Sequence, residues 1–559
     1  MKSISITRFI GTTLLLLFAI VITSCETKKS KNYYFNPISG NNQNSGTSKS
    51  APFKTLSKIK ELTLLPGDSI LLAANTTFTT PLILENVQGL KQQPIVVSNY
   101  ANSKNSQKAV IKTNGYLNGI RVENASFIEI NNLKISANPL KAKKKSTKQE
   151  MRCGVLVNTS VKNNYKHIYL KNLDVANVFY ENENISRSLK ETKSANGTQN
   201  YGYGIRFINK TKDAVLNDIK IESCSVTNVS HTGIKLTSWK NKRNYGIENF
   251  MISNTKVSRT GGPGIQMSGV KDGHIFNNTV DISGSNDDSR KWARGSGLWT
   301  WGSANVLIEK NRFTNANGPG DSAGAHIDFN CNNIVLQYNF SANNAGGFCE
   351  ILGNNYNCAY RYNISVNDGF RVKGENNAFQ EGKVFWLSGY VGSRKKRNGP
   401  FNSYFYNNTI YVKTSIKAKM AITRKAKGVL IANNIFHIEG YSKMVNGDQY
   451  NPEKKDKSVS KNIFFENNLF LHKSSWPEKM PIQDKKPMFG DAKFKNLGGP
   501  SLQDYIPSSA ELIKNKGINI QKLANDTIGS IYGLSLKKDI LGNTIIGLPD
   551  LGAVEIATE

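Results

Sequence analysis

Two short motifs recur from about residue 115 to residue 470, and they limit the fold of this chain more than any other feature. One motif is a short apolar strand that ends in asparagine, and neighbouring copies such as Asn339 and Asn363 are 24 residues apart. That spacing is typical of one turn of a coil with three short strands. The asparagines of this motif are Asn132, Asn172, Asn311, Asn339, Asn363, Asn408, Asn434 and Asn468.

The second motif begins with glycine and continues as an alternating strand, with almost no helical periodicity nearby. Stacked coils of parallel strands bury one continuous core, so the repeats predict an all-β parallel β-helix. The asparagines are expected to form a ladder of amide hydrogen bonds along its axis, although any one of them could be an ordinary turn residue. The glycine motif starts at Gly204, Gly233, Gly264, Gly297, Gly324, Gly346 and Gly369.

Side chains alternate between the two faces of a strand, so each glycine motif predicts inward and outward positions. Ile205 and Phe207, for example, are expected inside. The outward positions then form two columns along the axis. The first column contains Arg206, Lys235, Gln266, Trp299, His326, Phe348 and Arg371. The second contains Ile208, Thr237, Ser268, Trp301, Asp328, Glu350 and Lys373.

Aligning the sixth motif on Gly346 buries Cys349 and avoids burying an unpaired carboxylate. In this register Asp328 and Glu350 lie side by side on successive coils, about one strand spacing of 5 Å apart. Two carboxylates this close do not both ionise easily, which is the pairing that acid/base cleavage of a glycosidic bond requires. Two solvated carboxylates facing lysines are the alternative.

Three further predictions surround this pair. His326 could tune or relay a proton. Asp321 is a candidate third carboxylate, with a turn residue as the favoured alternative. Trp299 and Trp301 are expected to stack on sugar rings, unless they pack beneath a loop.

Cations lie toward both ends of the columns. Arg206 and Lys235 at one end, and Arg371 and Lys373 at the other, are predicted to bind sulfate or carboxylate groups of a substrate, with Gln266 between them. Each alone could be an ordinary surface cation. The formal net charge of +32 also favours a polyanionic partner. Part of that charge is interpreted as solvated loops at residues 141–148, 394–397 and 454–457.

The N-terminal 24 residues have the pattern of a signal peptide. Residues 22–25 resemble a bacterial lipobox, which predicts a lipid-modified Cys25 and a lipoprotein at the outer membrane, cell surface or periplasm. Acidic polysaccharide is then a more probable polyanion than nucleic acid, because the protein leaves the cytoplasm. The other five cysteines lack metal-ligand spacing and are expected to be small buried residues.

Three segments resemble the pectate-lyase-like right-handed parallel β-helix superfamily of carbohydrate-active proteins. Residues 33–74 are similar to its N-terminal cap with a short helix, residues 326–363 and 379–390 to its coils, and residues 504–517 with 547–555 to its C-terminal end. The resemblance implies a right-handed helix over nearly the whole mature chain. The expected organisation is a signal peptide (1–24), a tether (25–32), a β-helix with its cap (33–495) and a C-terminal capping segment (496–559).

Three functions follow as hypotheses. The first is a monomeric glycoside hydrolase of a sulfated or acidic polysaccharide, such as a fucan or carrageenan, that uses Asp328 and Glu350. The second is a lyase of a uronate polymer with Lys235, His326, Arg371 or Lys373 as the base. The third is a surface protein that binds glycans without cleaving them. No cofactor is expected, and calcium at Asp287 and Asp288 is only weakly indicated.

Overall fold

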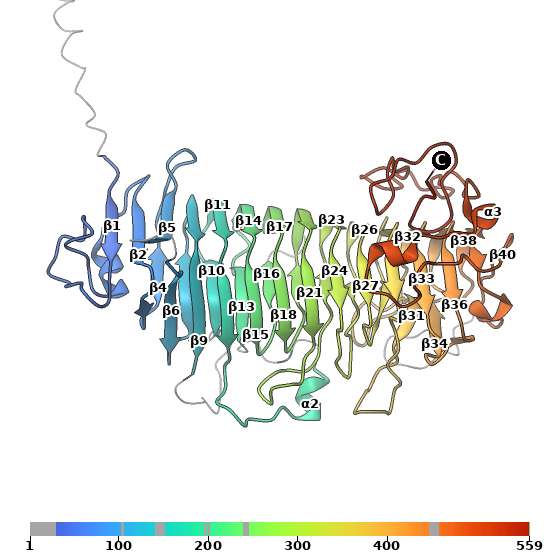
Figure 1. Cartoon of the computed structure of the whole chain (residues 1–559), viewed down its shortest axis with the longest axis horizontal. Helices are drawn as coiled ribbons and strands as arrows, with labels where there is room; N and C mark the ends of the chain where they lie inside the picture. Colours follow the sequence, from blue (N-terminus) through green and yellow to red (C-terminus); the bar gives the residue numbers. More distant parts are fainter. Residues whose placement is uncertain are drawn as a thin grey trace, which may run out of the picture.

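The computed structural model describes residues 29–101, 106–139, 151–194, 197, 202–238, 245–445 and 458–557. They form an elongated right-handed parallel β-helix, whose coils follow one another along a single axis (Figure 1). Each full coil supplies one strand to each of three parallel sheets, which we call sheets A, B and C. The predicted fold class is confirmed.

Sheets A and B each contain 14 strands within the described residues. Sheet A consists of β1 (Asn32–Phe35), β2 (Ser69–Ala73), β5 (Ile95–Tyr100), β8 (Ile128–Asn131), β11 (Asn163–Lys171), β14 (Ala214–Glu222), β17 (Ile247–Ser253), β20 (Val270–Phe276), β23 (Ala304–Glu309), β26 (Asn332–Gln337), β29 (Ala359–Arg361), β32 (Phe401–Tyr406), β35 (Lys427–Ala432) and β38 (Lys461–Glu466). Sheet B consists of β3 (Thr77–Phe78), β6 (Ala109–Asn114), β9 (Leu133–Asn138), β12 (Asp174–Val178), β15 (Ser225–Val229), β18 (Lys256–Thr260), β21 (Thr279–Ser283), β24 (Arg312–Thr314), β27 (Phe340–Ala342), β30 (Ile364–Val366), β33 (Thr409–Val412), β36 (Ile435–Ile438), β39 (Leu469–Phe470) and β40 (Met488–Phe489).

Sheet C contains 12 strands in the same described part of the chain and contains the glycine motif. Its strands are β4 (Leu82–Glu85), β7 (Asn118–Glu123), β10 (Cys153–Thr159), β13 (Tyr203–Asn209), β16 (Ile234–Ser238), β19 (Ile265–Ser268), β22 (Leu298–Trp301), β25 (Ala325–Ile327), β28 (Gly347–Ile351), β31 (Lys383–Leu387), β34 (Ala418–Ile422) and β37 (Ser442–Met444).

Helices are few and short among the described residues. They are the 3₁₀ helices η1 (Leu56–Glu61), η2 (Lys473–Ser475) and η3 (Leu502–Tyr505), and the single-turn α2 (Leu189–Thr192) and α3 (Ala510–Ile513). None of the described helices has the length and hydropathy to cross a bilayer.

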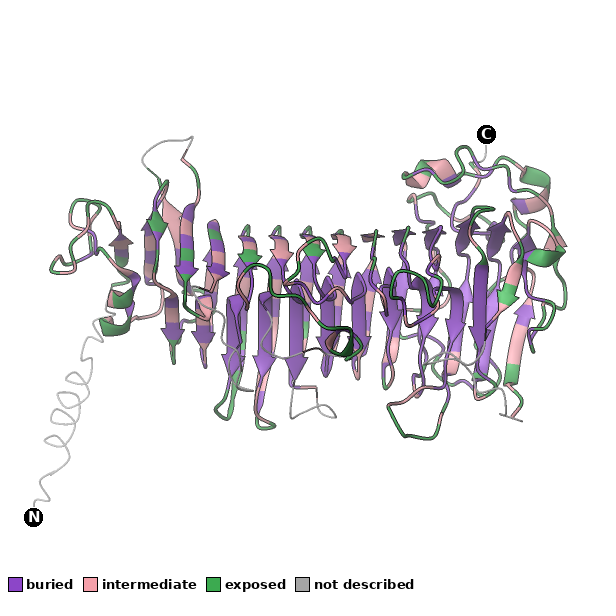
Figure 2. Ribbon diagram, turned by 90° about the horizontal axis from the view of Figure 1, so that it is seen from below, coloured by how far each residue is buried: buried purple, intermediate pink, exposed green. Residues whose placement is uncertain are grey.

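The core follows the predicted alternation. In β13, Ile205 and Phe207 point inward and pair in register with Ile234 and Leu236 of β16. Buried residues run along the whole length of the solenoid, while exposed ones concentrate in loops and at the ends (Figure 2). The glycine at the head of each motif permits close packing at one corner, because a Cβ on Gly204 would lie 2.3 Å from Val226 Cγ1.

The asparagine ladder exists over half of the helix. Each amide nitrogen donates to the side-chain oxygen of the asparagine on the next coil at 2.9–3.0 Å. Asp484 accepts the last of these bonds at 2.7 Å. The ladder residues are Asn278, Asn311, Asn339, Asn363, Asn408, Asn434 and Asn468, all buried.

Asn278 was not predicted as a ladder residue. Asn132 and Asn172 do share an amide bond along the axis, from Asn172 Nδ2 to Asn132 Oδ1 at 2.6 Å, but they lie outside the buried ladder. Both lie one position before the ladder, in the left-handed turn at φ of 58° and 52°. The ladder position itself is apolar in these early coils, where Leu133 and Leu173 fill it.

The two ends of the core are closed by apolar side chains. At the N-terminal end, Leu56 and Ile59 of η1 pack into the core, as a 3₁₀ rather than an α-helical cap. At the other end, the Trp476 ring contacts Phe436 and Phe465. The later C-terminal residues instead cover the outer faces of sheets A and B over the last coils. Five cysteines are free and buried, as expected, and Cys25 lies outside the described residues.

Candidate active site

A pocket of about 230 Å³ opens on the outer side of sheet C, where β22, β25 and β28 lie side by side. Strand residues and loop residues line it together. Its lining consists of Arg294, Trp299, Trp301, Asp321, His326, Asp328, Phe329, Glu350, Leu352, Tyr390, Gly392 and Ser393. The predicted residues Trp299, Trp301, His326, Asp328 and Glu350 therefore converge on one site, together with Asp321.

The register predicted between β25 and β28 is wrong by two residues. Ile327 pairs with Ile351, and Ala323 with Gly347, so Glu350 lies beside His326 rather than beside Asp328. In this register Phe348 lies beside Gly324, at the position that glycine fills in earlier coils. Its ring packs in the core against Tyr360 at 5.3 Å. A shift of two leaves each side chain on its face, so Glu350 still points outward.

Asp328 directly follows β25 and is buried, with 7% of its surface exposed. One carboxylate oxygen accepts a bond from Trp299 Nε1 at 2.8 Å, and the other accepts the Phe329 backbone N–H at 2.8 Å. Burial raises the pKa of Asp328 to about 7, against these two hydrogen bonds, which lower it. This carboxyl group can therefore hold or release a proton near neutral pH.

Glu350 occupies the middle of β28 and is 6% exposed. Burial raises its pKa well above the usual range. The nearby Lys383 cation opposes that shift, whereas the negative charges of Asp321 and Asp328 add to it. Burial therefore favours the protonated form of Glu350.

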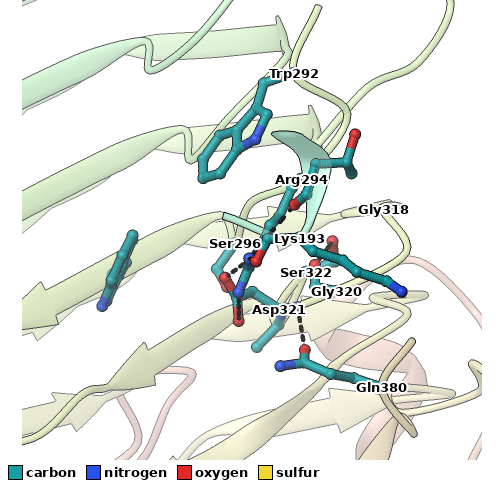
Figure 3. A network of polar contacts seen from close by, with 12 residues as sticks. Lys193, Trp292, Arg294, Ser296, Gly318, Gly320, Asp321, Ser322 and Gln380 are labelled. Carbon is teal, nitrogen blue, oxygen red and sulfur yellow. Dashed lines mark hydrogen bonds and ion pairs between the residues drawn. The ribbon is translucent and has the colours of Figure 1, made fainter. Parts of the chain in front are cut away.

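Asp321 differs from Asp328 and Glu350 because the guanidinium group of Arg294 is bound to its carboxylate. Its two carboxylate oxygens accept bonds from Arg294 Nε at 2.9 Å and Nη2 at 3.3 Å, as Figure 3 shows. Burial alone would raise the pKa of Asp321, but Arg294, with His326 and Arg371, holds it below its usual value. The φ of 49° shows that Asp321 is also the turn residue that was favoured as its alternative.

Arg294 is itself held by a distant loop. Its Nη1 donates to the Lys193 carbonyl at 2.7 Å and to the Thr192 carbonyl at 3.4 Å. These carbonyls belong to the loop that carries α2 between β12 and β13, and Trp292 Nε1 also donates to this loop at the Glu191 carbonyl at 3.3 Å. The α2 loop thus reaches along the helix to fix the arginine that binds Asp321.

His326 is buried between β22 and β28. Its Nδ1 lies 2.9 Å from Ser296 Oγ, and its ring is tilted against Trp299 at 5.6 Å. Burial lowers the pKa of His326 to about 4, so the imidazole is neutral at neutral pH. A neutral imidazole can orient a neighbouring group, but it is not a source of protons there.

Aromatic side chains form one wall of the pocket. Trp301 meets Phe329 edge to face at 5.7 Å, and Phe329 meets Tyr390 in the same way at 5.7 Å. Trp299 is buried beside Asp328, so it is not the exposed stacking surface that was predicted. Phe329 and Tyr390 were not predicted as site residues, because they follow the ends of strands and belong to neither recurring motif.

The predicted binding cations are arranged differently. Arg206, Lys235 and Gln266 do form the expected column, but all three are buried, and the Arg206 guanidinium lies over the Tyr203 ring at 4.3 Å. Burial, followed by the Arg206 charge, lowers the pKa of Lys235 well below its usual value. These three side chains are therefore buried on sheet C and do not form an open site for the anionic groups of a substrate.

The prediction for Arg371 and Lys373 as strand residues is wrong. The strand of that coil is β31, and the two residues lie in the loop before it. Arg371 donates to the carbonyls of Gln380, Gly318 and Asp321 at 2.8–2.9 Å and so ties loops together. Lys373 is exposed on the same loop.

The acidic pair weakly indicated for calcium is bound to cations. Asp287 pairs with Lys291 at 2.5 Å and with Arg259, and Asp288 pairs with Arg290 at 2.7 Å. Within the described ranges, no group of three or more histidine, cysteine or acidic side chains is arranged to hold a metal ion.

Fold and site together define a right-handed parallel β-helix that carries a buried carboxylate cluster on one sheet. The chain is 23% identical to a lacto-N-biosidase of Bifidobacterium longum subsp. longum, over 95% of this chain and 37% of that protein. It thus spans little more than a third of that relative's length. No family model matches the sequence.

Solved structures agree on the fold. The native GH136 lacto-N-biosidase from Eubacterium ramulus is similar with a TM-score of 0.55 and 21% identity, over 74% of this chain and 68% of that one. Its selenomethionine derivative gives a TM-score of 0.54 and 20% identity, over 74% of this chain and 67% of that one. These similarities show the parallel β-helix fold that the resemblance implied.

Proposed function

We propose that this protein is a glycoside hydrolase, with its reaction centre in the sheet C pocket. The observation that carries the proposal is one pocket with three carboxyl groups whose pKa values are displaced in opposite directions: Asp321 downward, and Asp328 and Glu350 upward. Carboxyl groups held in different protonation states are what glycosidic bond cleavage requires. The names of both similar proteins, lacto-N-biosidases, support the same class.

Asp328 is the general acid in this proposal. With a pKa of about 7 it retains its proton in much of the population at neutral pH, and it can protonate the leaving oxygen of the glycosidic bond. Trp299, which donates to one of its oxygens, holds the carboxyl group in a fixed orientation.

The partner of Asp328 must be ionised, either to attack the sugar or to activate water. Glu350 was the predicted partner, and its role stays a prediction. Its upward pKa shift favours the neutral form, however, whereas Asp321 is kept charged by Arg294. We therefore assign the ionised role to Asp321, and to Glu350 a hydrogen bond to the substrate from within the same pocket.

A sulfated or otherwise acidic polysaccharide remains the proposed substrate class, and the net charge of +32 supports it. The name of the similar proteins supports an oligosaccharide that contains lacto-N-biose instead. The Trp301, Phe329 and Tyr390 wall is compatible with both, because apolar ring faces stack on any pyranose.

The test is a screen of purified protein against sulfated, uronate and neutral glycans, read both by new reducing ends and by ultraviolet absorbance. Hydrolysis yields reducing ends without absorbance, whereas the alternative lyase yields an absorbing double bond. The proposal fails if products absorb, or if glycans are retained without any cleavage, as the non-catalytic alternative requires. Two of the bases proposed for the lyase are poorly placed to act. Arg371 donates hydrogen bonds to three backbone carbonyls, and Lys235 is buried.

We also propose that the protein is a lipoprotein, acylated at Cys25 after removal of residues 1–24 and located at the outer membrane, cell surface or periplasm. Metabolic labelling with a fatty acid tests this, because the Cys25→Ser variant should lose the label. Labelling of that variant would contradict it.

A further inference from the structure

The loop between β31 and β32 brings a dense positive charge to the edge of the pocket. Tyr390, Gly392 and Ser393 of this loop line the pocket, and the next four residues, 394–397, are all basic. In the linear sequence this run indicates only a solvated loop, because nothing there relates it to Asp328 or Glu350.

Backbone hydrogen bonds hold the loop in place at both ends. Asn398 N donates to the Gly389 carbonyl at 2.8 Å and so closes the base of the loop. Gly353 N donates to the Tyr390 carbonyl at 2.9 Å, and Asn354 N to the Asn398 carbonyl at 2.9 Å. The loop is thus attached to the segment that follows β28, the strand of Glu350.

The basic side chains begin at the pocket wall itself. A Cβ placed on Gly392 would lie 3.6 Å from Lys395 Cδ and 4.0 Å from Phe329 Cζ. The Lys395 stem and the Phe329 ring therefore flank the same glycine, where a Cβ would also be strained at φ of 115°. Lysine stems commonly cover apolar surface in this way while the ammonium group stays in water.

These cations are available to a ligand, unlike those deeper in the pocket. Arg294 is bound to Asp321, and Lys383 Nζ donates to the Glu381 carbonyl at 3.0 Å. Arg394, Lys395 and Lys396 are exposed, and no carboxylate in the described part of the chain is paired with them. In the pocket interior, in contrast, the Arg294 cation is already paired with Asp321.

We propose that residues 393–396 form a subsite for an anionic substituent, a sulfate ester or a carboxylate, on the sugar that extends from the pocket mouth. The inference rests on the proposed hydrolase function and gives it a substrate class. The sugar at the cleavage point is uncharged, and the next sugar bears the anion. Arginine and lysine bind such oxyanions by charge-assisted hydrogen bonds.

The test uses the R394Q/K395Q/K396Q variant of the full chain. Its matched control is K54Q/K60Q/K91Q, which removes the same charge from exposed lysines of the first coils, far from the pocket along the axis. Substrates are the cleaved glycan and its desulfated or carboxyl-reduced form. The two treatments distinguish sulfate from carboxylate as the recognised group.

The subsite variant should raise KM for the anionic glycan about tenfold, with kcat nearly unchanged, and should lose most of the salt dependence of kcat/KM. The control variant and the uncharged glycan should show neither effect. An equal loss on both glycans, an unchanged KM, or a neutral glycan as the preferred substrate would overturn the subsite.

Binding of uncleaved glycan to Asp328→Asn, measured by calorimetry with and without the three loop substitutions, separates the two proposals. If Asp328→Asn still cleaves as fast as the unmodified protein, the general-acid role of Asp328 fails, but the KM comparison between the anionic and uncharged glycans still tests the subsite. If Asp328→Asn is inactive and the loop substitutions do not weaken binding of the anionic glycan, only the subsite fails.

Discussion

The asparagine ladder and the sheet C pocket are two buried polar regions of one β-helix, and they are satisfied in opposite ways. In the ladder, the Asn339 amide nitrogen donates both to Asn363 Oδ1 and to the Ile308 carbonyl, and its neighbours repeat this pattern. In the pocket, Asp328 and Glu350 are equally buried, yet the pKa of each is raised. Buried amides that are fully hydrogen-bonded stabilise the fold. Buried carboxyl groups whose charge is only partly compensated can instead gain or release a proton.

The sharpest test of this contrast is Asp328→Asn. We expect kcat to fall about 10³-fold, because the general acid is lost while the amide keeps the shape of the carboxyl group. A carboxyl group whose pKa is raised on folding destabilises the protein at pH values above its unfolded pKa, so the variant should be at least as stable at neutral pH. Kinetics and thermal unfolding measured on the same preparation check both. Near-normal turnover would remove Asp328 from the mechanism.

The converse substitution is Asn363→Ala in the ladder. It leaves the Asn339 N–H and amide groups without their acceptor and the Leu336 carbonyl without its donor. We expect the free energy of unfolding to fall by about 3 kcal/mol, since each unpaired buried group costs about 1–3 kcal/mol. The specific activity of the folded fraction should stay unchanged. Denaturant unfolding measures the first quantity, and an undiminished stability would contradict the ladder's structural role.

Within the pocket, Arg294→Met tests how the charge of Asp321 is maintained. Arg294, His326 and Arg371 all favour the ionised form of Asp321. Without Arg294 the pKa of Asp321 should rise, so the acidic limb of the kcat/KM profile should move up by about one pH unit or more. The basic limb, near pH 7 from Asp328, should move less, because Arg294 has only a small effect on the pKa of Asp328. A uniform loss at every pH would instead show a purely structural role, and Arg294→Lys should restore part of the shift.

The smallest effect is expected from the aromatic wall. Trp301→Ala should raise KM about fivefold and leave the pH profile unchanged, since one aromatic stacking contact is worth about 1 kcal/mol. Trp301→Phe is the matched control and should retain most of the affinity. A change in the pH profile of Trp301→Ala would mean that this side chain belongs to the proton chemistry rather than to binding.

The same contrast explains how far the sequence could predict the structure. The inward columns recur on every coil and the ladder asparagine on each coil from Asn278 onward, so a period of two within a strand and one copy per coil determine them. That repetition is why Asn311 to Asn468 were assigned correctly, and why Trp299 and His326 were placed in one column.

Prediction failed where the repeat is interrupted. At Gly346 and Gly347 two glycines suggest two registers, but the Ile327 to Ile351 pairing fits neither and places Phe348 opposite Gly324. The residues from Gly369 to Lys373 match the glycine motif in sequence, but they form a loop. The Asp321 to Arg294 ion pair depends on the fold of a loop more than a hundred residues earlier, which no local pattern encodes.

The direction of the ladder bonds has a consequence for synthesis. Every ladder amide donates to an oxygen that lies later in the chain, from Asn278 onward to Asp484. A nascent chain that folds from its N-terminus therefore always ends in one donor whose acceptor has not yet been made. The ladder thus keeps one open donor until Asp484 has been synthesised, and the carboxylate of that single acidic side chain closes the ladder.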